Sequence, residues 1–276
     1  MAEKKQSINF EMILRSAIEL PGIKISRTDY LRKSLSKHFG EDIVNKAIET
    51  NPAQAGISVK DLDRISKSSI NYETSRVTGL SAAAGIPGGW AMAATIPADA
   101  AQFFGHIIRM LQKLAYLYGW QEMFKDDGDD FDDETANKLI IFIGVMFGVK
   151  VANATLMKIA GLAALNVPKL LMRQALTKGA IYPIVKKIAA VIGAKMTTAI
   201  FAKGVGKIIP VVGAVVSGGI TFAFFKPMSI RLKKYLASLP PADVEFYESS
   251  HDDDVIEVDF TDIDIENSEV IDDNEE

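Results

Sequence analysis

The sequence predicts an all-α fold: a multi-helix bundle of roughly eight to ten helices with glycine-rich apolar hairpins and a disordered acidic C-terminal tail. Three observations indicate this class. Apolar residues recur at helical spacing in the N-terminal half, alanine- and glycine-rich stretches fill the C-terminal half, and nothing resembles a β-sheet domain. With 276 residues, of which 48% are hydrophobic and 24% charged, the chain can bury a substantial core without resembling a polytopic membrane protein.

Residues 1–56 predict an N-terminal cap of short amphipathic helices. We expect these helices over Ser7–Leu20, Asp29–Phe39 and Glu41–Glu49. They end in turn at Pro21-Gly22, at Gly40 and at Asn51-Pro52, because proline and glycine interrupt helical geometry. Ser26 or Thr28 is expected to cap the second helix.

Residues 57–240 predict a larger helical domain. We expect a helix over Val59–Leu80, a helix over Asp99–Tyr118, an acidic loop at Asp126–Glu134 and an apolar helix at Leu139–Val149. Two stretches have no charge: Leu80–Ala98, interrupted by Pro87-Gly88-Gly89, and Ile208–Phe225, interrupted by Ser217-Gly218-Gly219. Small residues let backbones approach closely, whereas Pro and Gly break a continuous helix.

Charge is distributed unevenly along the chain. The net charge of −4 hides an acidic tail, residues 241–276, in which thirteen acidic residues and no Lys or Arg lie between His251 and Glu276. Such charge density is typical of a disordered extension, although the alternation of acidic with apolar residues would also suit a strand added to a partner's sheet. From Thr135 to Ala242 there are fifteen Lys or Arg and no Asp or Glu, which predicts attraction to an anionic partner.

Three passages resemble the EcsC family, which takes its name from a protein encoded beside a bacterial transporter of the ATP-binding-cassette type. The passages are SRVTGLSAAAGIPGGWAMAATIPADAAQFFGHIIRMLQKLAYLYGW, LIIFIGVMFGVKVANATLMKIAG and GKIIPVVGAVVSGGITFAF. The shared pattern is a small-residue turn, a Pro-x-Asp that opens a helix ending Tyr-Gly-aromatic, and a late Lys-x-x-Pro-x-x-Gly. It covers about Val59–Leu239. The resemblance implies a bacterial, helical, membrane-related protein, and it supplies no catalytic residue.

The helix expected from Asp99 has the sharpest candidate site. Its polar residues fall within an arc of about 80° on an otherwise apolar helix: Asp99, Gln102, His106, Arg109 and Lys113. Such a stripe could form a buried polar network, a proton relay or an anion-binding face, with Asp99, His106 and Arg109 as the catalytic candidates. The alternatives are a solvent-facing stripe or a structural pairing of Asp99 with Gln102 and His106.

Several kinds of site lack the residues they need. The chain has no cysteine, and its histidines (His38, His106 and His251) lack metal-ligand spacing, so we expect no metal site. Gly204–Lys207 lacks the preceding glycine and the following Ser/Thr of a phosphate loop, so we expect no nucleotide or other cofactor. Lysine predominates over arginine after Thr135, and no nucleic-acid-binding signature is present, which disfavours nucleic acid as the anionic partner.

The two uncharged stretches predict contact with a membrane. A spanning helix needs about 20 apolar residues, and these stretches approach that length only with turn-forming residues in the middle. Cations on both sides of Ile208–Phe225 favour a hairpin that dips into lipid, or two half-helices packed through small residues; the alternative is a core helix pair of a soluble bundle. The residues expected to contact the membrane or another anion are Lys150, Lys158, Lys186, Lys187, Lys195, Lys203, Lys207, Lys226, Arg231, Lys233 and Lys234.

These features predict a non-enzymatic, membrane-associated accessory or regulatory protein of a bacterial envelope, transport or secretion process. The alternative is a soluble helical protein that binds a hydrophobic ligand or performs acid–base chemistry at Asp99, His106 and Arg109. The expected partners are an anionic membrane surface and a membrane protein or transporter. The start of the chain lacks an apolar segment of secretory type, so we expect the cytoplasmic face of the bacterial membrane, or the cytoplasm.

Overall fold

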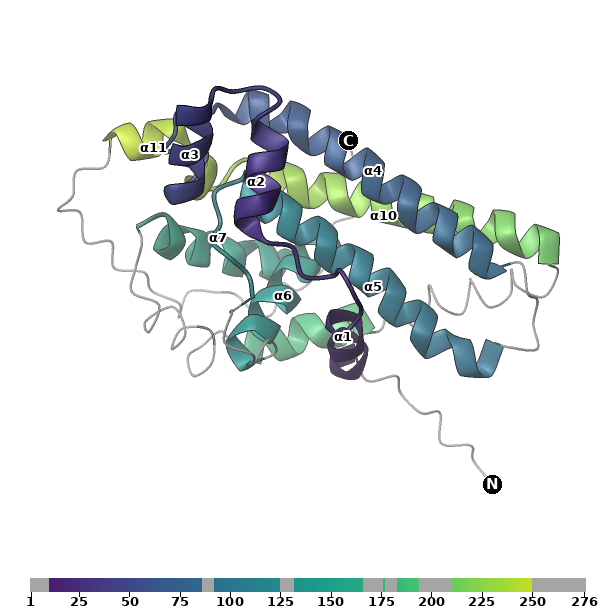
Figure 1. Cartoon of the computed structure of the whole chain (residues 1–276). Coiled ribbons are helices and arrows are strands. Elements are labelled where there is room, and N and C mark those ends of the chain that lie inside the picture. Colours follow the sequence, from purple (N-terminus) through teal and green to yellow (C-terminus); the bar gives the residue numbers. More distant parts are fainter. Residues whose placement is uncertain are drawn as a thin grey trace, which may run out of the picture.

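Helices are the main regular structure in the described part of the computed structural model, and no residue there forms a strand, which confirms the predicted fold class (Figure 1). It describes residues 10–85, 92–124, 132–165, 176, 183–193 and 210–249; for 80–85, 92–99 and 210–221 this covers the helix backbone only. Of the residues that can be interpreted, 78% are helical and none forms a strand.

The N-terminal cap consists of α1 (Phe10–Ile18), α2 (Arg27–Leu35) and α3 (Glu41–Glu49). The predicted cap of the second helix is Ser26, whose Oγ accepts the Asp29 N–H at 3.2 Å. The apolar face of α1 is buried and packs against α5 (Met92–Leu117). The helical spacing of apolar residues in the sequence therefore corresponds to the buried faces of the cap.

Two long helices form the spine of the molecule. Helices α4 (Val59–Gly85) and α10 (Pro210–Leu236) lie side by side and run in opposite directions (Figure 1), and an ion pair between Asp63 and Lys233, 2.8 Å long, joins them. Helix α10 is continuous, so the predicted interruption at Ser217-Gly218-Gly219 is wrong. Glycine in a helix costs about 1 kcal/mol, a cost that packing along a whole neighbouring helix can offset.

Helix α5 begins earlier than the sequence predicted. It starts at Met92, seven residues before Asp99, and includes Pro97 near its N-terminal end. The Pro-x-Asp pattern predicts a helix start at Asp99, but Pro97 is the sixth residue of α5, past the first turn, and the helix continues across it with one intrahelical hydrogen bond fewer. The backbone of α5 therefore extends the helix into the uncharged stretch Leu80–Ala98.

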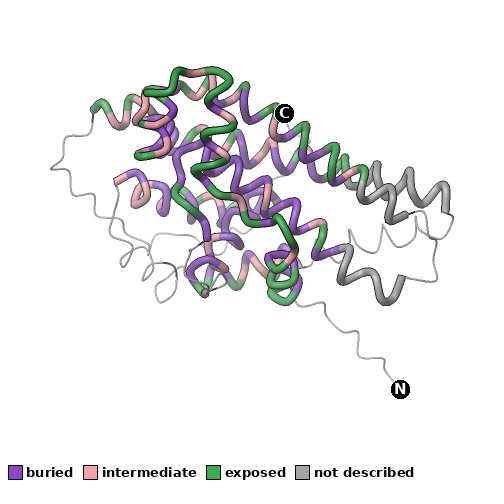
Figure 2. The backbone as a smooth tube through the Cα atoms, in the orientation of Figure 1, coloured by how far each residue is buried: buried purple, intermediate pink, exposed green. Residues whose placement is uncertain are grey.

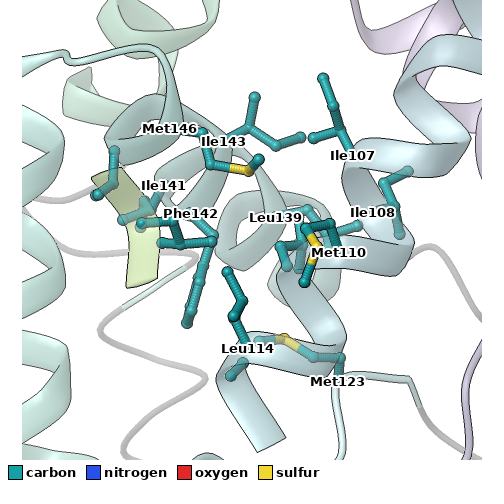
Figure 3. Close-up of a cluster of buried hydrophobic side chains, with 14 of the residues drawn as sticks. Ile107, Ile108, Met110, Leu114, Met123, Leu139, Ile141, Phe142, Ile143 and Met146 are labelled. Atoms are coloured by element: carbon teal, nitrogen blue, oxygen red, sulfur yellow. The ribbon is translucent and has the colours of Figure 1, made fainter. Parts of the chain in front are cut away.

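The centre of the core lies between α5 and α6 (Asp133–Met146) (Figure 3). Ile107 and Leu114 of α5 and Leu139 and Phe142 of α6 are almost completely buried in this cluster. Helix α6 begins inside the predicted acidic loop, because the Asp132 carboxylate accepts the Thr135 N–H at 2.8 Å and caps it. Helix α7 (Lys150–Ala164) follows, and residues 183–193 are also helical.

The C-terminal boundary differs from the prediction. A 3₁₀ turn, η2 (Pro240–Ala242), and a short helix, α11 (Val244–Ser249), occupy the first residues of the stretch predicted as a disordered tail from residue 241. The Asn51 side chain donates to the Tyr247 hydroxyl at 2.9 Å and ties α11 to the end of α3. The rest of the predicted tail, residues 250–276, lies outside the described residues.

Candidate functional site

Three members of the polar stripe on α5 meet a carboxylate that the sequence analysis did not single out. That carboxylate is Glu73 of α4. His106 Nδ1 lies 3.2 Å from Glu73 Oε2, while Arg109 Nε and Lys113 Nζ lie 3.3 Å and 2.6 Å from Oε1. Arg109 also donates to the carbonyl of Gly22, in the loop between α1 and α2. We call Glu73, His106, Arg109 and Lys113 the Glu73 cluster.

The Glu73 cluster is buried, so the prediction of a solvent-facing stripe is wrong for its members. Glu73 has no exposed surface, His106 and Lys113 are more than nine-tenths buried, and Arg109 is partly buried. Figure 2 shows how buried and exposed residues alternate along the helices. Gln102 is exposed and lies apart from the cluster. The side chain of Asp99 lies outside the described residues, so its predicted pairing stays a prediction.

The neighbours of Glu73 hold it in its charged form. Burial alone would raise the pKa of Glu73, because a carboxylate loses hydration in the core. Hydrogen bonds from His106 and Lys113, and the positive charges of Lys113 and Arg109, outweigh that effect and lower the pKa of Glu73 to about 2. Burial in turn lowers the pKa of Lys113, while the contact with Glu73 opposes that change. The cluster is thus a set of mutually compensating charges.

Another polar residue of α5 connects the N-terminal cap to the core. The Gln112 side chain, fully buried, accepts the Ile25 N–H at 2.9 Å and donates to the Ile23 carbonyl at 2.9 Å. Together with the contact between Arg109 and Gly22, it holds the α1–α2 loop along α5. A buried backbone segment needs such partners for its N–H and C=O groups. Polar residues of α5 therefore have a structural role: they hold the α1–α2 loop in place.

Sequence reasoning missed Glu73, although one signal was available. Glu73 is the only acidic residue between Asp63 and Asp99, and it faces a helix whose stripe has two cations and a histidine. An isolated carboxylate in a stretch without other acidic residues, opposite a helix with several basic side chains, indicates a buried ion pair, because an unpaired buried charge is costly. The sequence alone could not show which residue on α4 lies opposite His106.

The second feature of interest is one end of the helical spine, which we call the tip: residues 80–85 of α4, 92–99 of α5 and 210–221 of α10. These segments come from distant parts of the sequence, yet they lie at the same end of the molecule (Figure 1). Apart from Asp99, which directly follows the first of them, these residues belong to the uncharged stretches Leu80–Ala98 and Ile208–Phe225. From Val77 to Gly105 the single charged residue is Asp99, and from Ile208 to Phe225 there is none.

Exposed aromatic residues lie next to the tip. Tyr72 of α4 and Phe222 and Phe224 of α10 keep 58%, 49% and 51% of their surface exposed. Cations accompany two of these rings: the Arg76 guanidinium lies 5.8 Å from the Tyr72 ring centre, and Lys226 Nζ lies 5.6 Å from that of Phe222. Exposed large aromatic side chains beside an uncharged segment are typical of an interaction surface.

The predicted anion-contacting residues have different environments. Lys150, Lys186 and Lys234 are exposed, and Lys158, Lys187 and Lys226 are partly buried. Two others have structural partners: Lys233 is buried against Asp63, and Arg231 donates to the Met146 carbonyl at 2.7 Å at the end of α6. That placement leaves Lys233 without the exposure that an anion contact requires. Lys195, Lys203 and Lys207 lie outside the described residues.

Comparisons with protein-family models, with curated proteins and with solved structures find no match to this chain. Within the described ranges, no helix is both long and apolar enough to cross a membrane. The same part of the chain contains no group of three or more His, Asp or Glu side chains that could hold a metal ion.

Proposed function

We propose that this chain is a membrane-associated accessory or regulatory protein that contacts an anionic lipid surface through its tip. One observation supports this proposal above the others: helical segments of two uncharged stretches, separated by more than a hundred residues, lie at one end of the molecule. Exposed Tyr72, Phe222 and Phe224 flank that end. A soluble protein would bury such aromatic side chains in its core, whereas a lipid interface stabilises them at the surface.

Electrostatic attraction would bring the chain to the surface. Lys150, Lys186 and Lys234 are exposed, and they lie in a stretch, Thr135 to Ala242, whose fifteen charged residues are all Lys or Arg. A lysine near an anionic membrane contributes about 1 kcal/mol, and salt screens this attraction. Insertion of the uncharged part of the tip would then supply a contribution to the binding free energy that salt does not remove.

The resemblance to the EcsC family supports the biological setting of the proposal. It favours a role in a bacterial envelope, transport or secretion process, at the cytoplasmic face of the membrane and beside a membrane protein or transporter. It favours no reaction, in agreement with a non-enzymatic role. These statements are part of the proposal and go with its test.

Sedimentation with lipid vesicles tests the proposal. The full chain is mixed with vesicles of phosphatidylcholine alone, or with phosphatidylglycerol added, at low and at high salt. We expect binding to the anionic vesicles that high salt weakens. Absence of binding to both compositions would contradict the proposal.

A pair of variants distinguishes binding through these aromatic rings from nonspecific hydrophobic binding. The double variant Phe222→Ser, Phe224→Ser removes two exposed rings beside the tip, while Met157→Ser removes an exposed apolar side chain on α7. We expect the double variant to bind anionic vesicles several-fold more weakly and Met157→Ser to bind like the unmodified chain. Equal binding by the two variants would show that these rings take no part.

A second candidate function is binding of a hydrophobic ligand, or acid–base chemistry, at Asp99, His106 and Arg109. The contact between His106 Nδ1 and Glu73 supports it, because a carboxylate orients an imidazole and fixes its tautomer. His106→Gln tests this candidate. An effect on cell phenotype with unchanged thermal stability favours a site, and a loss of stability alone favours a structural role.

A further inference from the structure

We infer that the tip enters the bilayer end-on, as far as Asp99, so that exposed aromatic and cationic residues lie within the phospholipid headgroups or on their aqueous side. We call these residues the headgroup ring: Tyr72, Arg76, Phe222, Phe224 and Lys226. This inference rests on the proposed function and adds an orientation, a depth and a partner: the anionic headgroup layer together with the first carbons of the acyl chains.

The antiparallel pair α4–α10 places the aromatic residues at one level. The ion pair between Asp63 and Lys233 fixes the register of the two helices. Tyr72 is nine residues after Asp63, and Phe224 is nine residues before Lys233, so both lie toward the tip. At 1.5 Å per residue, each is about 14 Å beyond the ion pair. Rings from two distant segments thus lie at the same height on the spine.

The Glu73 cluster gives a second reference height along the spine, and it relates residues of α5 to residues of α4. Glu73 and His106 are in contact and therefore share a height. Counted toward the tip at 1.5 Å per residue, Arg76 is about 5 Å further on and Asp99 is about 10 Å further on. Gly85, the last residue of α4, is about 18 Å further on. Beyond Asp99 there is thus about 8 Å of helix that has no charged residue.

These heights can be compared with the layers of a membrane surface. Segments that lie in the interface reach roughly 5 to 10 Å into the boundary between headgroups and acyl chains. The headgroup layer adds about 5 to 7 Å on each side of the hydrocarbon. With Asp99 at the inner edge of that layer, Arg76, about 6 Å further out, lies among the phosphates, where basic residues are enriched in membrane proteins. The backbone of Tyr72 and Phe224, about 12 Å further out than Asp99, lies on the aqueous side of the headgroups.

Asp99 sets the limit because of its charge. A carboxylate that moves into hydrocarbon loses its hydration, and no Lys or Arg lies on the uncharged stretches around it. The opposite end of the molecule, with η2 and α11, then points away from the membrane (Figure 1). Ser249, where the described chain ends, would face the aqueous side.

Depth measurements with single cysteines test the inference. The chain has no cysteine, so each introduced thiol is labelled alone. Ser81→Cys marks the tip, Ala223→Cys the headgroup ring and exposed Ser238→Cys the opposite end of α10. Each variant receives an environment-sensitive fluorophore and is bound to phosphatidylcholine–phosphatidylglycerol vesicles. These vesicles contain spin-labelled lipid that quenches either in the acyl chains or at the headgroup. If Ser81→Cys fails to fold, Ala94→Cys on α5 replaces it.

We expect acyl-chain quenching at residue 81, headgroup quenching at residue 223 and no quenching at residue 238. If vesicles bind the chain but residue 81 is unquenched, or residues 223 and 238 respond alike, the end-on orientation is overturned while membrane association stands. If no vesicle binds the chain, both the orientation and the proposed function are overturned.

Discussion

Lys113 Nζ lies 2.6 Å from Glu73 Oε1, inside the contact between α4 and α5. These are two of the three helices that lead to the tip, and the ion pair fixes their heights relative to each other. Because His106 and Arg109 share the same carboxylate, the Glu73 cluster joins the helical spine to α5 at the base of the tip. A rigid base would let the tip meet lipid in one orientation.

Replacing the central carboxylate should destabilise the fold strongly. In Glu73→Gln the buried charge of Lys113 and the partly buried charge of Arg109 lose their counter-ion. Removing one partner of a buried ion pair costs about 3 to 5 kcal/mol. We expect a loss at the lower end of that range in urea unfolding, because Arg109 keeps its bond to Gly22. Glu49→Gln, at an exposed position on α3, should leave the free energy of unfolding nearly unchanged. Equal losses in both variants would contradict a central role for Glu73.

The same carboxylate should make stability depend on acid pH. The folded pKa of Glu73, about 2, lies below its ordinary value of 4.5, so the folded chain holds the proton less tightly than the unfolded chain. Its contribution is therefore complete above pH 4.5 and is lost as the pH falls toward 2. A tenfold change in proton affinity corresponds to about 1.4 kcal/mol, so the contribution is about 3 kcal/mol. Glu73→Gln should have a smaller decline in unfolding free energy between pH 5 and pH 2.5 than the unmodified chain. Parallel curves would contradict this.

The sequence allowed the helices to be predicted well where their apolar spacing was regular. Helix α3 has the predicted bounds, and Ser26 caps α2 as one of two predicted candidates. Predictions failed where proline and glycine were interpreted as breaks, as at Ser217-Gly218-Gly219, since long-range packing of α10 on α4 outweighs a local preference. The polar stripe was visible on one helix, but its partner Glu73 depends on the register of two helices. The spacing of residues within one helix does not show how that helix is aligned with its neighbour.

A buried arginine should be irreplaceable in the cap. Arg27 donates to the carbonyl oxygens of Trp120 at 3.1 Å, Ile48 at 2.7 Å and Thr50 at 2.8 Å. Lysine has one compact ammonium group and cannot reach acceptors spread around a planar guanidinium. Arg27→Lys should therefore lower the free energy of unfolding by about 2 kcal/mol or more, because buried carbonyl groups lose their donors.

The matched control for the arginine test is Arg32→Lys on the same helix. Arg32 is exposed and donates to the Asn45 side chain at 3.1 Å. Its replacement should leave thermal stability almost unchanged. Amide hydrogen exchange should in addition rise at the end of α3 in Arg27→Lys alone. Unchanged exchange there would contradict the assigned role of Arg27.

Replacement by alanine at two glycine positions should change the stability of the fold in opposite directions. Gly119, just after α5, has a φ of +92°, and a Cβ there would collide with the carbonyl of Pro241. Gly119→Ala should destabilise the fold, since an L residue is strained at this φ and the close contact between residue 119 and Pro241 of η2 must open. Gly79 lies within α4 with open space at its Cβ position. Gly79→Ala should stabilise the fold by about 0.5 to 1 kcal/mol. Melting temperatures that shift in the same direction would contradict this assignment.

Asp99, which directly follows the uncharged stretch Leu80–Ala98, should limit how tightly the chain binds to neutral membranes. Asp99→Asn removes the carboxylate that would meet hydrocarbon if the tip went deeper. A charged carboxylate at the centre of a membrane helix costs about 2.5 to 3.5 kcal/mol, and less near the interface. We therefore expect a gain of about 1 kcal/mol, or roughly fivefold, in partitioning to phosphatidylcholine vesicles. Asp61→Asn, in the first turn of α4 at the opposite end of the spine, should partition like the unmodified chain. If both variants partition equally, Asp99 does not lie at the lipid boundary, and the depth assigned to the tip is wrong.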